Sequence, residues 1–159
     1  MTRGVVSVDE LAAASAELRA NGKRLVVTNG CFDLLHLGHV RYLQAARALG
    51  DALAVGVNGD DSVRALKGEG RPLNSEDARA EVLAALRAVN YVAVFPDVRA
   101  TDFLQRVRPA VYAKGGDYTP ESLNPEERAV LDATGAEIRI IPFEDGFSTT
   151  ELIERMGTA

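Results

Sequence analysis

The chain has very few metal-binding and redox-active side chains: one cysteine and two histidines occur among its 159 residues. A single cysteine cannot form an intramolecular disulfide bond, which agrees with a reducing compartment. A structural zinc ion usually requires four nitrogen or sulfur ligands. A metal site made from Cys31, His36 and His39 is therefore disfavoured, and we assign no metal ligand among the side chains.

The sequence also lacks an apolar run of membrane length and a signal peptide, so we expect a cytoplasmic protein without a membrane partner. Its net charge of −5 argues against nonspecific binding of nucleic acid, which depends on a basic surface. Positive charge used for binding must therefore be local. Because a chain of 159 residues fits one domain, we expect a single domain over 1–159, with 1–22 forming an accessory N-terminal helix.

Two common nucleotide-binding fingerprints are missing as well. No G-x-G-x-x-G follows the first apolar run and no G-x-x-x-x-G-K-[ST] occurs anywhere, which disfavours ordinary dehydrogenases and P-loop kinases. Short apolar runs nevertheless alternate with amphipathic stretches, which predicts a three-layer, Rossmann-like, doubly wound α/β sheet of five parallel strands. The predicted strands cover 25–27, 52–57, 91–95, 110–113 and 138–141. A nucleotide-sized ligand is then expected at the carboxyl edge of the sheet.

Helical spacing and capping residues predict the connecting helices at 8–20, 37–49, 62–66, 75–88, 101–107, 125–134 and 148–156. The first begins with Ser7 and Glu10 at capping-box spacing. In the helix over 75–88, the pattern predicts that Val82 and Leu86 face the core and that Arg79 does not. The stretch 67–72 holds two glycines and a proline, which predicts a mobile loop.

Both histidines of the chain lie at one predicted helix start, where His36 and His39 flank Gly38 directly after the first strand. A helix N-terminus presents unpaired backbone N–H groups and the positive end of the helix dipole, both of which suit phosphate. Gly38 allows close approach of the backbone to such an anion, and the imidazoles can add hydrogen bonds. The alternative is a capped helix with one histidine packed in the core and the other solvated.

The string His36-Leu37-Gly38-His39 resembles the H-x-G-H signature of the nucleotidyltransferase superfamily, and residues 28–36 (TNGCFDLLH) resemble its cytidylyltransferase-like branch. Residues 66–79, 114–118 and 147–153 are similar to the adenylyltransferases that activate heptose 1-phosphate. These motifs occur in the same order and cover most of the chain. Taken together they are far more specific than H-x-G-H alone.

This resemblance implies that an oxygen of a sugar phosphate attacks the α-phosphorus of ATP in line, without a covalent enzyme intermediate. The products would be an ADP-sugar and pyrophosphate, and Mg²⁺ would accompany ATP. It also makes a homodimer plausible, and we expect a free-standing enzyme rather than one fused to a sugar kinase. Two alternatives stay open: a cytidylyltransferase acting on glycerol 3-phosphate or another alcohol or sugar phosphate, and a catalytically silent nucleotide-binding module.

The resemblance and the residue types together give a candidate site. The predicted catalytic residues are His36, His39 and Lys67. The predicted nucleotide- and phosphate-binding residues are Thr28, Asn29, Gly30, Cys31, Phe32, Gly38, Lys114, Gly115, Asp117, Ser148, Thr149 and Thr150, and the predicted acceptor-binding residues are Asp33, Arg71 and Arg79. Several of them have a structural alternative: the cations can be solvated surface charges, Asp33 can bond the backbone of its turn, Cys31 can be a packing residue, and Ser148 to Thr150 can be a plain helix cap.

Overall fold

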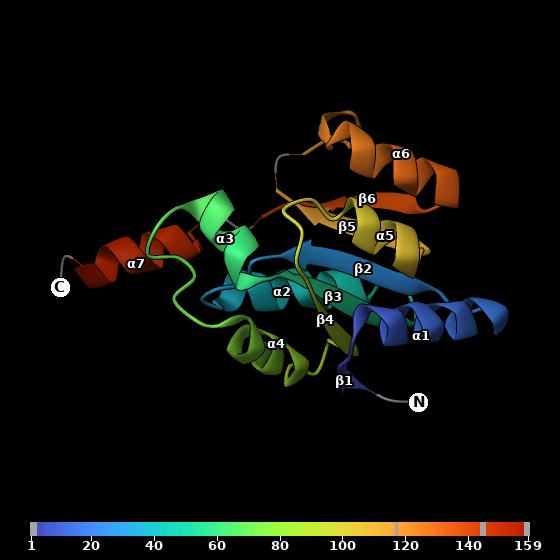
Figure 1. Ribbon diagram of the computed structural model, residues 1–159, viewed down its shortest axis with the longest axis horizontal. Helices are drawn as coiled ribbons and strands as arrows, with labels where there is room; N and C mark the ends of the chain where they lie inside the picture. Colours follow the sequence, from blue (N-terminus) through green and yellow to red (C-terminus); the bar gives the residue numbers. More distant parts are fainter. Residues whose placement is uncertain (1–2, 117, 144–145, 158–159) are drawn as a thin grey trace.

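The computed structural model describes residues 3–116, 118–143 and 146–157, and it confirms the predicted Rossmann-like α/β class (Figure 1). Six parallel strands form one sheet in the order β1-β4-β3-β2-β5-β6. The strands are β1 (Gly4–Val5), β2 (Leu25–Gly30), β3 (Ala52–Asn58), β4 (Tyr91–Phe95), β5 (Val111–Gly115) and β6 (Glu137–Ile141). The predicted count of five strands is one too low, because β1 has two residues and is too short to produce an apolar pattern.

The helices agree with the predicted order, although several ends differ. They are α1 (Val8–Ala20), α2 (Leu37–Arg47), α3 (Asp60–Lys67), α4 (Glu76–Ala84), α5 (Thr101–Val107), η1 (Pro120–Ser122), α6 (Pro125–Thr134) and α7 (Thr149–Gly157). The predicted capping box of α1 is confirmed: Ser7 Oγ accepts from the N–H of Glu10, and the N–H of Ser7 donates to the Glu10 carboxylate. None of the helices in the described ranges is both long and apolar enough to cross a membrane.

Helices cover both faces of the sheet, so alternate residues of one strand enter two different cores. In β2, Leu25 and Val27 pack in a cluster with residues of α1, α5 and α6. Val26 packs instead with residues of α2 and α4. Leu11 and Leu18 of α1 are buried in the first cluster. The helix that was expected to be accessory thus contributes buried side chains to one of the two cores.

The predicted inward face of the α4 segment is wrong for Val82 and Arg79, whereas Leu86, just beyond the end of the helix, packs against the core as predicted. Arg79, Ala80 and Leu83 are the buried residues of this helix, whereas Val82, predicted to face the core, is 53% exposed. The pattern failed because it placed the only charged residue of the buried face in solvent. The burial of Arg79 rotates the helix relative to that expectation.

The order of the strands places a topological switch point between β2 and β5. From β2 the chain builds outward through β3 and β4, and it then crosses to the other side of β2 to form β5 and β6. In open parallel sheets, ligands bind outside the carboxyl ends of the strands where the order reverses. The turn with both histidines follows β2, and Lys114 and Gly115 end β5, so these predicted site residues lie at the switch point.

Candidate active site

A cleft of about 890 Å³ opens at the carboxyl ends of β2, β3 and β5. Most of the predicted site residues line it together: Asn29, Gly30, Cys31, Phe32, Asp33, His36, Gly38, His39, Lys67, Arg71, Lys114, Gly115, Ser148, Thr149 and Thr150. Thr28 and Arg79 are not among the lining residues. Asp117 lies outside the described residues.

His36 and His39 form a compact pair at the start of α2, with 3.9 Å between their ring centroids. The backbone N–H of His36 donates to Nδ1 of His39 over 3.3 Å. Because Nδ1 accepts this bond, the proton of a neutral His39 is on Nε2, where it is free to bind a ligand. The ring of Phe32 also packs on His39, with 5.6 Å between centroids.

Both imidazoles are neutral near pH 7. Burial lowers the pKa of His36, and burial followed by the neighbouring His36 ring lowers the pKa of His39 to about 4. A neutral imidazole still has one N–H donor. The pair is therefore suited to donating hydrogen bonds to phosphate oxygens rather than to supplying protons at neutral pH.

The depressed pKa of His39 is expected to make the protein less stable in acid. Between pH 6.5 and about 4 the unfolded chain binds a proton at this residue more readily than the folded chain, so the free energy of unfolding falls as the pH is lowered through this window. Urea denaturation at several pH values checks this. His39→Asn should lose less stability than wild type over the same range, and equal losses would contradict the assignment.

Gly38 lies between the two histidines at the start of α2, and it has no room for a side chain. A Cβ there would lie 2.8 Å from Cβ of Phe147 and 2.9 Å from two ring atoms of His36. The sequence predicted that Gly38 leaves space for phosphate. The structure adds that a side chain would first displace the His36 ring or the segment that precedes α7.

Gly38→Ala is expected to lower turnover about 100-fold, because displacing a binding group by about 1 Å can have an effect of that size. Overpacking should also cost about 1–3 kcal/mol of stability. Pyrophosphate release and thermal unfolding measure the two effects. Gly157→Ala is the matched control, since its Cβ would meet nothing within 4 Å. Equal behaviour of the two variants would contradict the packing argument.

The N-terminus of α7 faces the same cleft as that of α2. Ser148 Oγ accepts from the N–H of Glu151, and Thr149 Oγ1 donates to the carbonyl of Leu34 over 2.9 Å. The first bond caps the helix, and the second fixes α7 to the turn after β2. The capping role and phosphate binding are compatible, because the backbone N–H groups of the first turn stay available to an anion.

Four basic side chains line the cleft: Lys67, Arg71, Arg99 and Lys114. Arg71 pairs with Asp33, and Nζ of Lys114 lies 4.8 Å from the ring centroid of Tyr118. Lys67 and Arg99 make no hydrogen bond or ion pair with another residue of the described ranges. These two cations are therefore available to pair with the negative charge of phosphate groups. Sequence reasoning missed Arg99, which is an isolated cation in the loop between β4 and α5.

Asp33 is buried and holds the loop between α3 and α4 against the turn after β2. Its carboxylate accepts from the backbone N–H groups of Leu73 and Asn74 at 2.8 and 2.9 Å and from Nε of Arg71 at 3.1 Å. Burial alone would raise the pKa of this carboxyl, but the two amides and the Arg71 guanidinium hold it below its usual value. These bonds favour the structural alternative for Asp33 over acceptor binding.

Arg79 is 2% exposed and lies beneath the cleft. Its guanidinium donates to the carbonyls of Asn74, Cys31 and Asn58 at 3.0, 2.7 and 2.8 Å, and to the carboxylate of Asp60 at 2.9 Å. These groups belong to four segments that meet under the cleft. The side chain joins these segments and is not among the groups that line the cleft, which favours a structural role for Arg79 over the predicted acceptor binding.

The environments of Thr28 and Cys31 also favour structural roles for these residues. The hydroxyls of Thr28 and Tyr42 share a buried hydrogen bond of 2.7 Å, and that of Tyr42 donates to the carbonyl of Ala113. This pair links β2, α2 and β5 below the cleft. Burial raises the pKa of the Cys31 thiol, which keeps it protonated and unsuited to act as a nucleophile at neutral pH.

One wall of the cleft was not predicted from the sequence. Ser122, Asn124 and Glu127 line it from the η1 and α6 segment. Glu127 is 7% exposed and accepts from the N–H of Ala100 over 3.0 Å. Asn58, at the end of β3, also lines the cleft. No local motif marks these residues, because only the tertiary fold brings α6 next to the start of α5.

The described residues contain no group of three or more His, Cys, Asp or Glu side chains that could hold a metal ion. Asp33 and Glu127 are the carboxylates described at the cleft, and both already accept backbone hydrogen bonds. Magnesium in nucleotide enzymes is held largely by substrate phosphates and water.

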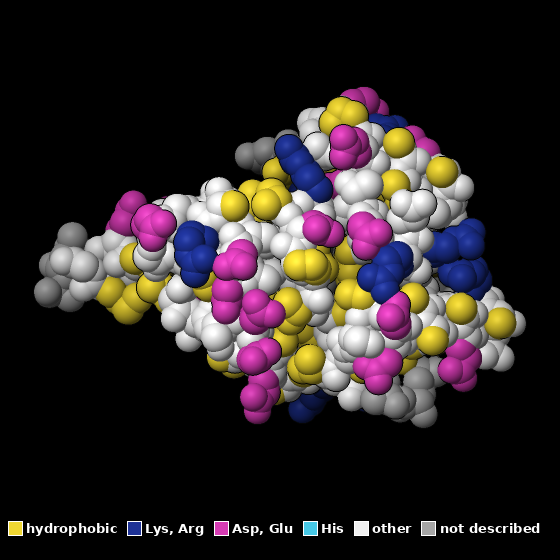
Figure 2. All heavy atoms as spheres, viewed as in Figure 1, with side chains coloured by type: hydrophobic (Ala, Val, Ile, Leu, Met, Phe, Trp, Pro, Cys, Tyr) yellow, Lys and Arg dark blue, Asp and Glu magenta, His cyan; other side chains and the backbone are white. Residues whose placement is uncertain are grey.

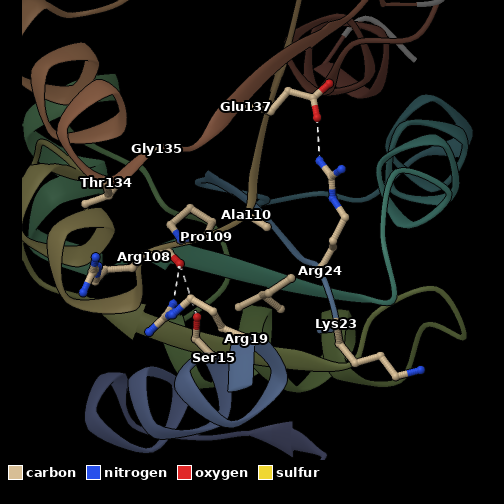
Figure 3. Close-up of a pocket in the computed structure, with 11 residues that line it drawn as sticks. Ser15, Arg19, Lys23, Arg24, Arg108, Pro109, Ala110, Thr134, Gly135 and Glu137 are labelled. Atoms are coloured by element: carbon tan, nitrogen blue, oxygen red, sulfur yellow. Dashed lines mark hydrogen bonds and ion pairs between the residues drawn. The ribbon is translucent and has the colours of Figure 1, made fainter. Parts of the chain in front are cut away.

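A second pocket of about 430 Å³ lies at the opposite end of the sheet. There Arg19 and Ser15 donate to the carbonyl of Arg108, and Arg24 pairs with Glu137 (Figure 3). Basic side chains gather at this end of the molecule, where α1, α5 and α6 terminate (Figure 2). Cations near helix C-termini offset the negative end of the helix dipole. We interpret this charge as stabilising the helices and assign no ligand to the pocket.

The cleft lies at the switch point of the sheet and combines two helix N-termini with neutral histidine donors and with cations that are unpaired among the described residues. This arrangement is typical of nucleotide-binding α/β domains that transfer phosphoryl or nucleotidyl groups. The family model described as cytidylyltransferase-like matches residues 27–155. The chain therefore belongs to the cytidylyltransferase-like family, and it is a nucleotidyltransferase.

Similar proteins include the bifunctional protein HldE of Geobacter sulfurreducens, which is 48% identical over 152 residues, covering 96% of this chain and 31% of the relative. The bifunctional protein HldE of Alkalilimnicola ehrlichii is 50% identical over 157 residues, covering 99% and 32%. The chain thus spans about a third of the length of these relatives. The crystal structure of a lipopolysaccharide core biosynthesis protein from Thermoplasma volcanium matches with a TM-score of 0.63 and 26% identity, covering 77% of this chain and 98% of that one.

Proposed function

We propose that the chain transfers AMP from ATP to heptose 1-phosphate, giving ADP-heptose and pyrophosphate. The observation that carries the transfer chemistry is the convergence of His36, His39 and the N-terminus of α7 on one cleft. The choice of heptose 1-phosphate is supported by the motifs at 66–79, 114–118 and 147–153, and by the similarity to the bifunctional protein HldE.

In the proposed reaction, an oxygen of the acceptor phosphate forms a bond to the α-phosphorus of MgATP. The bond from that phosphorus to the oxygen that bridges it to the β-phosphorus breaks, and pyrophosphate leaves with the electron pair. Charge builds up on the phosphate oxygens in the transition state. Fixed donors aimed at those oxygens stabilise it more than they stabilise the ground state.

The side chains have separate parts in this scheme. His36 and His39 donate N–H groups to the α- and β-phosphate oxygens from the start of α2. Lys67, at the end of α3, is the cation that offsets the charge of the departing pyrophosphate. Arg71 and Arg99 bind the phosphate of the acceptor in this scheme. The protonated state of Cys31 supports direct transfer without a covalent enzyme intermediate.

Pyrophosphate release tests the proposal. ATP and CTP are each offered with heptose 1-phosphate and with glycerol 3-phosphate, in the presence of Mg²⁺, and His39→Asn serves as the inactive control. Release of pyrophosphate only in the mixture of ATP and heptose 1-phosphate supports the proposal. Release with CTP, or with glycerol 3-phosphate, supports the rival cytidylyltransferase or another acceptor. No release in any mixture would favour the catalytically silent nucleotide-binding module.

A further inference from the structure

Phe143 is the most exposed large apolar side chain that the structure describes, at 68%. It follows β6 by two residues and lines the active-site cleft. An aromatic ring left open to water forgoes the gain that burial would give it. Its place in the cleft suggests that a ligand, rather than another part of this chain, covers the ring.

The ring is held on a backbone platform. A Cβ on Gly115 or on Gly116 would lie 2.7 Å from a ring atom of Phe143, so both positions need to be glycine for the ring to rest there. The centroid of Tyr42 lies 6.5 Å away. The contacts with the glycines fix where the ring lies while most of its surface stays open.

Phe143 also differs in chemistry from the polar residues that line the same cleft. Ser122, Asn124 and Glu127 offer hydroxyl, amide and carboxylate groups, which suit the hydroxyls of a sugar. A planar, uncharged ring suits a planar heterocycle, because stacking needs two flat faces. Of the two substrates of the proposed reaction, only the nucleotide has such a face.

We propose that Phe143 is the stacking platform for the nucleobase and that it favours a purine over a pyrimidine. This inference rests on the proposed function, because it takes the nucleotide to be a substrate. The two fused rings of adenine overlap the phenyl ring more than the single ring of cytosine does. Stacking on an aromatic side chain contributes enough to change affinity about tenfold or more.

Isothermal titration calorimetry can separate stacking from phosphate binding. ATP, CTP and inorganic tripolyphosphate are titrated into wild type, Phe143→Ala and Phe143→Tyr. Phe143→Ala is expected to weaken ATP binding about tenfold, to weaken CTP binding less and to leave tripolyphosphate binding unchanged. Phe143→Tyr should restore ATP binding. Val82→Ala, which removes a 53% exposed side chain from α4, is the matched control and should change none of the three.

Each other outcome has a distinct meaning. Equal weakening of ATP and tripolyphosphate by Phe143→Ala would overturn the proposal and assign the ring a structural role. Unchanged ATP binding would overturn it while leaving nucleotide transfer intact. An equal loss for ATP and CTP would remove the purine preference. If wild type bound neither ATP nor tripolyphosphate, the proposed function itself would fail.

Discussion

Replacing His39 with asparagine is expected to lower kcat by about 100-fold to 1,000-fold while the protein stays folded. The asparagine carbonyl can still accept the N–H of His36, which His39 Nδ1 accepts in the structure. The variant loses the Nε2–H donor, and the loss of one fixed donor to the transition state typically has an effect of this size. Pyrophosphate release at saturating substrate measures kcat, and circular dichroism measures folding.

Two further variants at this position sharpen the test. His39→Ala should lose as much turnover as His39→Asn, because neither has the donor. His39→Gln should recover part of it, since its amide N–H can reach close to the position of Nε2. Turnover near the wild-type level in His39→Asn, or an unfolded protein, would show that the assigned role is wrong.

Replacing Arg79 with methionine is expected to lower the free energy of unfolding by about 3–5 kcal/mol. The guanidinium is buried and bonds three carbonyls and the carboxylate of Asp60. Methionine fills much of the space but leaves these acceptors without their donor, and buried acceptors without a partner are costly. Urea denaturation gives the change in free energy.

Arg64→Met is the matched control for the loss of an arginine. Arg64 pairs with Asp61 on the surface of α3, where both side chains are at least half exposed. Exposed ion pairs contribute about 0–1 kcal/mol, so this variant should unfold close to wild type. A similar stability for Arg64→Met and Arg79→Met would contradict the view that Arg79 holds the base of the cleft together.

The α/β class and most strand positions were predictable, because buried parallel strands appear in a sequence as short apolar runs. Tyr91–Phe95 was predicted to the residue. The paired edge strand Gly4–Val5 was not, because a strand of two residues has no periodicity to detect. The orientation of α4 failed for a different reason. Pattern analysis places arginine in solvent, and it has no means of foreseeing the acceptors that Arg79 finds in three other segments.

In the candidate site, too, residues that form a local motif could be predicted, whereas residues that only the tertiary fold brings together could not. His36, Gly38 and His39 are adjacent in the chain, so their motif could be recognised directly. Arg99 and Phe143 lie in separate loops and Glu127 lies in α6, so only the tertiary fold brings them to the same cleft. Asp33 illustrates a third case, in which the residue was found but its bonds to Leu73 and Asn74 depend on a loop about 40 positions later.

Because the chain crosses over the sheet from β4 to β5, independent parts of the sequence line different parts of the cleft. The histidine pair and Gly38 belong to the segment after β2, whereas the polar wall comes from η1 and α6, whose backbone does not contribute to the sheet. Substitutions at the less buried wall residues Ser122 and Asn124 are therefore expected to leave the strands and the histidine pair in place. Under the proposed function, a domain built in this way can acquire a new acceptor by changes in one segment, and related enzymes can then differ in substrate while they share the same chemistry.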